Sequence, residues 1–283
     1  MKKINNQSFE GERSLFALND AEIDRCTFLE GESPLKESKN IKIHDSTFSW
    51  KYPLWYASHI EVINTTFKEM ARSGIWYTKD IKMMHCQIDA PKIFRRSEDI
   101  FLSDCQMPNA SESLWGCKNI KIENCSAKGD YFGMNAENIE IDNLHLDGNY
   151  CFDGGKNIVV RNSVLNSKDS FWNCENVTIV DSVIDGEYLA WNTKNITFIN
   201  CKIKSHQALC YIDGLKMINC QLIDSDLCFE FCENIDAEIN SRVLSIKNPY
   251  SGTIKVNGVD ELILDEQFID KNKTNIIIKD EQI

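Results

Sequence analysis

The sequence has few positive charges for its size, no long apolar run and no recognisable export signal. Its 283 residues carry 31 Lys and Arg against 43 Asp and Glu, a formal net charge of −12, so a nucleic acid or an anionic membrane would not attract it. No apolar stretch approaches the about eighteen residues of a membrane-spanning helix, and the first residues, MKKINNQSFEGERS, lack the apolar core of a secretory signal. We therefore expect no nucleic-acid partner, no membrane span and a cytoplasmic location with reduced thiols.

Motifs for metals and cofactors are also missing. Cys228 and Cys232 are four residues apart and have no second cysteine pair to complete a zinc site. Strand-like residues follow Gly154 and Gly155, so these glycines do not form a phosphate-binding loop. The five histidines fall at different positions of the repeat described next. We expect neither a metal ion nor an organic cofactor.

A repeat of 19 to 21 residues runs through most of the chain. An apolar anchor residue opens segments of the type I-x-I-x-x-(N/D)-(C/S), at Ala21, Ile41, Ile60, Ile81, Ile100, Ile120, Ile139, Ile158, Val177, Ile196, Leu215, Ile235 and Ile254. Self-similarity at this period is typical of solenoid proteins. A polar residue and then a second apolar residue follow most anchors, and this alternation predicts a β-strand with one buried face.

Other positions of the repeat predict corners and interior. Asn or Asp stands just before most anchors and four residues after them, where these residues tolerate left-handed backbone and form corners. Cys, Ser or Thr usually follows, as a small side chain for a crowded interior. An apolar column six residues before the anchors is predicted to face inward: Leu35, Leu54, Ile75, Phe94, Leu114, Phe152, Phe171, Leu209 and Phe229. Each coil is therefore predicted to contain three short strands.

These patterns predict an all-β fold, a single-stranded right-handed parallel β-helix of about thirteen coils of 19–21 residues. A leucine-rich horseshoe is the alternative, because its strand motif superimposes on this one, but the second half of each repeat lacks helical leucines. We predict a single domain over residues 1–283, with an N-terminal cap over 1–20, regular coils over 21–240 and irregular C-terminal coils or a cap over 241–283.

Several segments also resemble a known family. They are GESPLK (31–36), KYPLWY (51–56), SGIWY (73–77), APKIFRRS (90–97), GDYFGMN (129–135), GNYCFDG (148–154), SKDSFWN (167–173) and GEYLAWN (186–192). They resemble a bacterial family of right-handed β-helix proteins known as domain of unknown function 3737, and the likeness spans nearly the whole chain. The resemblance implies a pectin-lyase-like fold. It implies no established activity and no catalytic residues.

One column of the repeat suggests a binding face. Five of the six tryptophans stand five residues before an anchor, and strand alternation turns this column outward if its neighbour faces inward. Flat apolar rings beside fixed polar groups suit a sugar polymer, so we predict a carbohydrate ligand on this face. The predicted binding residues are Trp55, Trp76, Arg95, Arg96, Trp115, Tyr131, Asn135, Tyr150, Trp172, Asn173, Tyr188, Trp191, Asn192, Tyr211 and Glu230.

The same face carries candidate catalytic residues. Carboxylates on adjacent coils would lie about 5 Å apart and those two coils apart about 9 to 10 Å, which brackets the separations found in glycosidases. Asp153, Asp169 and Glu187 come from successive coils, so one could act as an acid of raised pKa while another stays ionised. Lys168 could bind a uronate carboxylate or stabilise the charge that develops in a lyase reaction. The predicted activity is that of a lyase or glycosidase on an acidic oligosaccharide.

Three other interpretations remain open. Aromatic columns in a solenoid also stack on themselves and serve packing alone. The face would equally suit a binding module that cleaves nothing. It would also suit a protein-interaction scaffold whose aromatic face is buried in a homo-oligomer.

Overall fold

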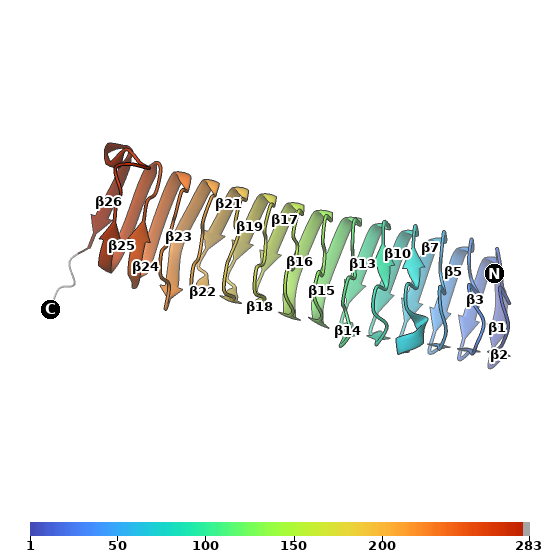
Figure 1. Ribbon diagram of the computed structural model, residues 1–283. Coiled ribbons are helices and arrows are strands. Elements are labelled where there is room, and N and C mark those ends of the chain that lie inside the picture. The colour runs from blue at the N-terminus through green and yellow to red at the C-terminus, as the bar shows by residue number, and fades with distance from the viewer. Residues whose placement is uncertain (280–283) are drawn as a thin grey trace. The chain divides into compact units, whose positions relative to one another are not determined.

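The chain folds as an all-β, right-handed parallel β-helix of about 15 turns with almost no helix (Figure 1). The structure is a computed structural model and describes residues 1–279. They form two compact units, Met1–Asp147 and a second unit that begins at Gly148. Within the described residues, no helix has the length and apolar character that crossing a bilayer requires.

The first unit consists of strands that return to the same position once per coil. Its elements are β1 (Lys2–Asn5), β2 (Ser8–Phe9), β3 (Asn19–Asp24), β4 (Thr27–Phe28), β5 (Lys39–His44), β6 (Thr47–Phe48), β7 (Ser58–Ile63), β8 (Thr66–Phe67), the 3-10 helix η1 (Glu69–Ala71), β9 (Ile75–Trp76), β10 (Lys79–Met84), β11 (Gln87–Ile88), β12 (Phe94–Arg95), β13 (Glu98–Ser103), β14 (Gln106–Met107), β15 (Lys118–Lys128) and β16 (Glu137–Asp147). Ile41 of β5 lies opposite Ala21 on one side and Ile60 on the other, all buried. The predicted anchor register is therefore confirmed in this unit.

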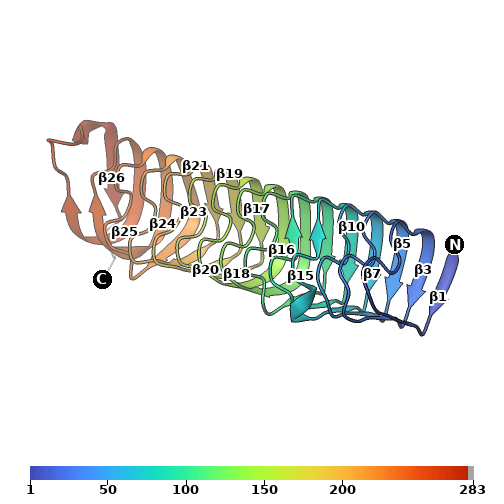
Figure 2. The ribbon, with the colours of Figure 1, turned by 45° about the vertical axis from the view of Figure 1, so that its right-hand side comes forward.

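The second unit repeats the same arrangement. Its elements are β17 (Lys156–Arg161), β18 (Val164–Asn166), β19 (Glu175–Val180), β20 (Val183–Asp185), β21 (Lys194–Ile199), β22 (Lys202–Lys204), β23 (Asp213–Ile223), β24 (Glu233–Lys247), β25 (Gly252–Ile263), the 3-10 helix η2 (Lys271–Lys273) and β26 (Thr274–Ile278). Val177 lies opposite Ile158 and Ile196 in parallel register. Successive coils lie side by side when this unit is viewed from either direction (Figure 1; Figure 2).

The coil count is slightly higher than predicted because both ends of the chain contribute strands to the ladder. Ile4 of β1 pairs with Ile23, within the segment expected to be an N-terminal cap. Ile276 of β26 pairs with Ile254 near the other end. Ile254 itself lies opposite Ala237 and not opposite Ile235, so the last anchor read from the sequence is displaced by two residues.

The third strand expected in each coil is mostly absent. Among residues 1–279, only β9 and β12 form there, and in the other coils this segment consists of turns with left-handed residues such as Tyr52 and Tyr56, at φ values of 62° and 56°. Hydrogen bonds between coils persist all the same, because the Leu54 amide donates to the Gly74 carbonyl at 2.8 Å and the Tyr56 amide to the Trp76 carbonyl at 3.0 Å. Left-handed residues keep the coils in register but interrupt regular strand geometry.

The column of small residues acts as a set of hydrogen-bond donors at the corners. The Cys105 thiol donates to the Met83 carbonyl at 3.5 Å, and the Ser97 hydroxyl donates to the Ile75 carbonyl at 2.9 Å. Cys, Ser and Thr can replace one another here because each supplies a short donor for a buried carbonyl. All twelve cysteines are free and buried, and burial raises the pKa of Cys117 to about 12. These thiols are packing groups, as predicted for the cysteines that follow the corner Asn or Asp residues.

Candidate functional site

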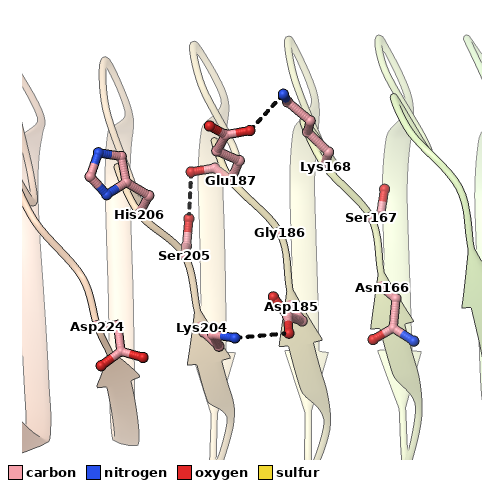
Figure 3. Close-up of a pocket in the computed structure, with 10 residues that line it drawn as sticks. All are labelled: Asn166, Ser167, Lys168, Asp185, Gly186, Glu187, Lys204, Ser205, His206 and Asp224. Carbon is pink, nitrogen blue, oxygen red and sulfur yellow. Dashed lines mark hydrogen bonds and ion pairs between the residues drawn. The ribbon is translucent and has the colours of Figure 1, made fainter.

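A pocket of about 580 Å³ lies on the second unit, where β18, β20 and β22 end (Figure 3). Its walls are Asn166, Ser167, Lys168, Asp185, Gly186, Glu187, Lys204, Ser205, His206 and Asp224. Three successive coils each contribute three consecutive residues, and a fourth contributes Asp224. The parallel register places Asn166 beside Asp185 and Asp185 beside Lys204. The strand ladder therefore fixes the spacing of the polar groups in the pocket.

Gly186 lets two coils approach closely in the middle of the pocket. A Cβ added at this position would lie 2.1 Å from the Ser167 carbonyl oxygen, closer than any side chain can be accommodated. In the next coil the Ser205 hydroxyl donates to the Glu187 carbonyl at 3.0 Å. The backbone of this wall is thus held by contacts that a larger residue at 186 would break.

Two ion pairs cross the pocket between neighbouring coils. Lys168 Nζ lies 2.5 Å from Glu187 Oε2, and Lys204 Nζ lies 3.6 Å from Asp185 Oδ2. The hydrogen bond from Lys168 lowers the pKa of Glu187, and the hydrogen bond to Glu187 raises the pKa of Lys168. Both groups of this first pair are therefore held in their charged forms.

Asp169 lies behind the pocket wall, not in it. It is only 3% exposed, and its Oδ1 atom has no hydrogen-bond partner. Burial raises the pKa of Asp169, while the Lys168 charge and a hydrogen bond from Tyr150 act in the opposite direction. The nearby charge of Glu187 raises the same pKa further. Asp169 and Glu187 therefore have pKa values shifted in opposite directions.

The raised pKa of Asp169 makes stability depend on pH. The folded state holds the Asp169 proton more tightly than the unfolded state, so this contribution is fully present below the ordinary aspartate pKa of about 3.9. It is lost as the pH rises through the folded pKa. As the pH rises from about 3.9 through the pKa of Asp169 in the folded state, we expect the urea midpoint of the wild type to fall relative to that of Asp169→Asn, because the carboxamide does not titrate. Asparagine also tolerates the left-handed backbone of residue 169, at a φ of 59°.

The control for this comparison is Asp236→Asn, a change at an exposed carboxylate of β24. Its pH profile should follow that of the wild type. Parallel profiles for the wild type and Asp169→Asn would contradict the raised pKa.

The tryptophans of the second unit pack against one another beside the pocket. Trp172 and Trp191 are half-buried, with ring centroids 5.4 Å apart and planes within 5°. The Trp172 indole donates to the Tyr188 carbonyl at 2.8 Å. Tyr188 connects this stack to the pocket, since its ring lies 5.2 Å from Trp191 and Lys168 Nζ lies 5.9 Å above it. The rings cover each other's faces, which favours the packing interpretation for these two positions.

The other predicted residues of the second unit lie outside the pocket. Asp153 accepts a hydrogen bond from Asn173, which in turn accepts one from Asn192, each at 2.9 Å. Glu230 is 8% exposed and pairs with Lys247 at 2.8 Å. The remaining two contact the tryptophan stack: Tyr150 meets Trp172 at 6.0 Å and Tyr211 meets Trp191 at 5.7 Å. Of the four catalytic candidates, the structure brings together Asp169, Glu187 and Lys168.

The predicted residues of the first unit form a separate stack. Trp55 and Trp76 are parallel with centroids 5.3 Å apart, and the Arg95 guanidinium lies between Trp76 and Trp115, 4.7 and 5.0 Å from their centroids. Glu112 holds Arg95 at 3.1 Å. Tyr131 contacts Trp115 at 6.4 Å, while Arg96 and Asn135 are exposed. A pocket of about 270 Å³ on this unit is lined by none of them.

Comparison with known proteins places the chain in a family. The model of a family described as protein of unknown function (DUF3737) matches residues 2–277. The chain belongs to this family. No curated protein matches the chain.

Solved structures similar to this DUF3737 chain are β-helix proteins. PfbA, a surface adhesin of Streptococcus pneumoniae, is 9% identical with a TM-score of 0.52, over 83% of this chain and 85% of the adhesin. An alginate lyase from Paenibacillus sp. str. FPU-7 is 11% identical with a TM-score of 0.37, over 95% of this chain and 99% of the lyase. A tailspike protein mutant of E. coli bacteriophage HK620, in complex with a hexasaccharide, is 9% identical with a TM-score of 0.41, over 93% and 60% of the two chains. The likeness to the adhesin shows the fold.

Most of the pocket residues of the DUF3737 chain were not among the residues predicted from the sequence. Lys168 and Glu187 were predicted, but Ser167, Gly186 and His206 were not. A usable signal exists, because Lys168, Glu187 and His206 each stand nine residues before an anchor and form a column of ionisable groups. Within residues 1–279, no group of three His, Cys, Asp or Glu side chains is arranged to hold a metal ion.

Proposed function

We propose that the second unit binds a carbohydrate in the pocket between Asn166 and Asp224. The observation that carries the proposal is the composition of this pocket of about 580 Å³, in which every lining residue except Gly186 has a polar side chain. Hydroxyl, amide, ammonium and carboxylate groups from successive coils line it, and a sugar presents matching hydroxyls to them.

The aromatic residues have a positioning role in this proposal. Trp172 and Trp191 stack on each other, and their indole groups donate to the carbonyls of Tyr188 and Gln207, at 2.8 and 3.4 Å. These contacts fix the coil segments that follow Glu187 and His206 in the pocket wall. A bound sugar then meets the pocket and the Tyr188 ring rather than the covered faces of the tryptophans.

Cleavage of the bound sugar is a second function that one observation favours. Asp169 and Glu187 have pKa values shifted in opposite directions, the pattern that separates an acid from a base in glycosidases. Ionised Glu187, which lines the pocket, would activate a water molecule or attack the sugar carbon, and the proton of Asp169 would reach the leaving oxygen through an intervening water molecule, because Asp169 itself does not line the pocket. Lys168 holds Glu187 in place through their 2.5 Å contact.

A single experiment with two readouts tests both functions. The full chain is presented to immobilised neutral, acidic and amino oligosaccharides, and soluble products are followed by chromatography. We expect binding of at least one class, and a change of about tenfold in affinity for Lys168→Ala. A neutral or acidic sugar loses a charged hydrogen-bonding group and binds more weakly, whereas an amino sugar meets an unpaired Glu187 and binds more tightly. Lys156→Ala is the matched control, because Lys156 also pairs with a carboxylate one coil away, Glu175 at 3.5 Å, but lies outside the pocket.

The outcomes separate binding from cleavage. No binding to any oligosaccharide, or equal binding by Lys168→Ala and the wild type, would overturn the binding function. Product release that persists in both Asp169→Asn and Glu187→Gln would overturn the assignment of these carboxylates to cleavage. A wild type that binds but releases no product would leave a binding module.

A further inference from the structure

The charges of the pocket are unevenly balanced. Three carboxylates, Asp185, Glu187 and Asp224, face two ammonium groups, Lys168 and Lys204, and one imidazole, His206. Each ammonium group is already paired with a carboxylate of the neighbouring coil, at 2.5 and 3.6 Å. An incoming anion would find no unpaired lysine here.

Asp224 is the carboxylate left over. It follows the end of β23 in a left-handed conformation, at a φ of 51°, and is exposed on the pocket wall. It forms no ion pair with any residue between 1 and 279. Figure 3 shows dashed contacts for Lys168, Lys204 and Ser205, and none for Asp224.

Ser167 lies on the wall of the same pocket, but its hydroxyl oxygen is closed to solvent. The group that the pocket leaves open to a charged ligand is therefore the exposed Asp224 carboxylate.

We propose that the sugar bound in this pocket carries a protonated amino group, a deepening that rests on the carbohydrate-binding function proposed above. Its ammonium group pairs with Asp224, and its hydroxyls bond to the other polar groups of the pocket wall. An acidic sugar, the substrate expected from the sequence, would have to break one of the two ion pairs and approach three carboxylates. A neutral sugar avoids that repulsion but gains no ionic contact. The carboxylates of the pocket thus favour an amino sugar by attraction and disfavour an acidic sugar by repulsion.

Three oligomers of equal length test the proposal by isothermal titration with the full chain. They are a glucosamine tetramer, an N-acetylglucosamine tetramer and a galacturonic acid tetramer. The first two differ only in the acetyl group on the C2 nitrogen of each ring, and the third carries a carboxylate on each ring. At low salt and pH 6 we expect the glucosamine tetramer to bind about tenfold more tightly than its acetylated form, the size of one charge-assisted contact. The galacturonic acid tetramer should bind most weakly. The preference should shrink in high salt.

Two matched variants decide whether the pocket is responsible. Asp224→Asn keeps the left-handed backbone and the shape of the side chain but removes the charge, and should reduce the preference to less than about threefold. Asp236→Asn removes one charge from an exposed strand residue outside the pocket and should leave the preference unchanged.

The results distinguish this inference from the function on which it rests. If the acetylated or acidic tetramer binds as tightly as the glucosamine tetramer, the amino-sugar inference is wrong and carbohydrate binding stands. Equal loss of preference in Asp236→Asn would also overturn the inference, because it would show a general attraction by the acidic chain. Failure of all three tetramers to bind would overturn both.

Discussion

Replacing Phe48 with alanine should lower the free energy of unfolding of the first unit by about 4 kcal/mol. Phe48 has no exposed surface and lies between two parallel rings, Phe28 at 4.5 Å and Phe67 at 4.9 Å. The substitution removes the buried ring, both stacking contacts and the volume that holds the adjacent coils apart. Urea denaturation followed by tryptophan fluorescence measures the change, because Trp55 lies in the same coil as Phe48 and Trp76 lies in the next coil.

Phe16→Ala is the control for this result. Phe16 is in the same unit but is 43% exposed, so its loss should change stability by less than about 1 kcal/mol. In a solenoid each coil is stabilised mainly by its two neighbours, and Phe48 contacts one ring on each side. If Phe48→Ala were as mild as Phe16→Ala, the row of rings would not be the feature that holds these coils together.

The strand ladder was predictable from sequence because each residue type acts locally. Ile41 and Ile43 alternate with polar residues, and this alternation alone defines a strand with one buried face. Asn119 and Asn124 occupy left-handed corners, at φ values of 55° and 53°, which their side chains tolerate. Repetition at a fixed period then places like residues opposite one another. Fold and register follow from this repetition.

The exposure of the tryptophans was not predictable in the same way. Strand alternation places Trp55 and Trp76 on the side opposite to the buried Leu54 and Ile75, but it does not decide which way the rings turn. In the structure the two indole rings stack on each other, with their centroids 5.3 Å apart. The Trp76 indole N–H also donates a hydrogen bond to the Lys92 carbonyl at 2.9 Å. The tryptophan rings pack against the neighbouring coil rather than extend into solvent, because packing gives the indole N–H a hydrogen-bond acceptor and buries the faces of the rings.

The pocket was missed for a different reason. It lies where β18, β20 and β22 end, and its depth depends on how closely the coils approach there. Gly186 permits that approach, yet a single glycine between Asp185 and Glu187 looks like an ordinary turn residue in the sequence. Only the distance from its position to the Ser167 carbonyl identifies its role.

Gly186→Ala should therefore open the pocket wall and weaken ligand binding. The new Cβ would meet the Ser167 carbonyl at 2.1 Å, and backbone on both sides must move apart to relieve this contact. We expect a loss of about 1 to 3 kcal/mol in stability, the usual cost of overpacking. The same movement displaces Lys168 from Glu187, so affinity for the bound sugar should fall by more than about tenfold. Thermal denaturation and titration with the tetramer that binds wild type measure the two effects.

Gly258→Ala provides the matched control. Gly258 is a buried glycine of the same unit, and the atoms nearest to its added Cβ belong to the Arg242 side chain, with Nη1 at 2.9 Å. A flexible side chain can move away. This variant should keep wild-type affinity and lose little stability. If Gly186→Ala behaved like Gly258→Ala, the close approach at Ser167 would not shape the pocket. If Gly186→Ala kept its stability but lost binding, the loss of affinity would come from the 2.5 Å contact between Lys168 and Glu187 and not from a general loosening of the coils.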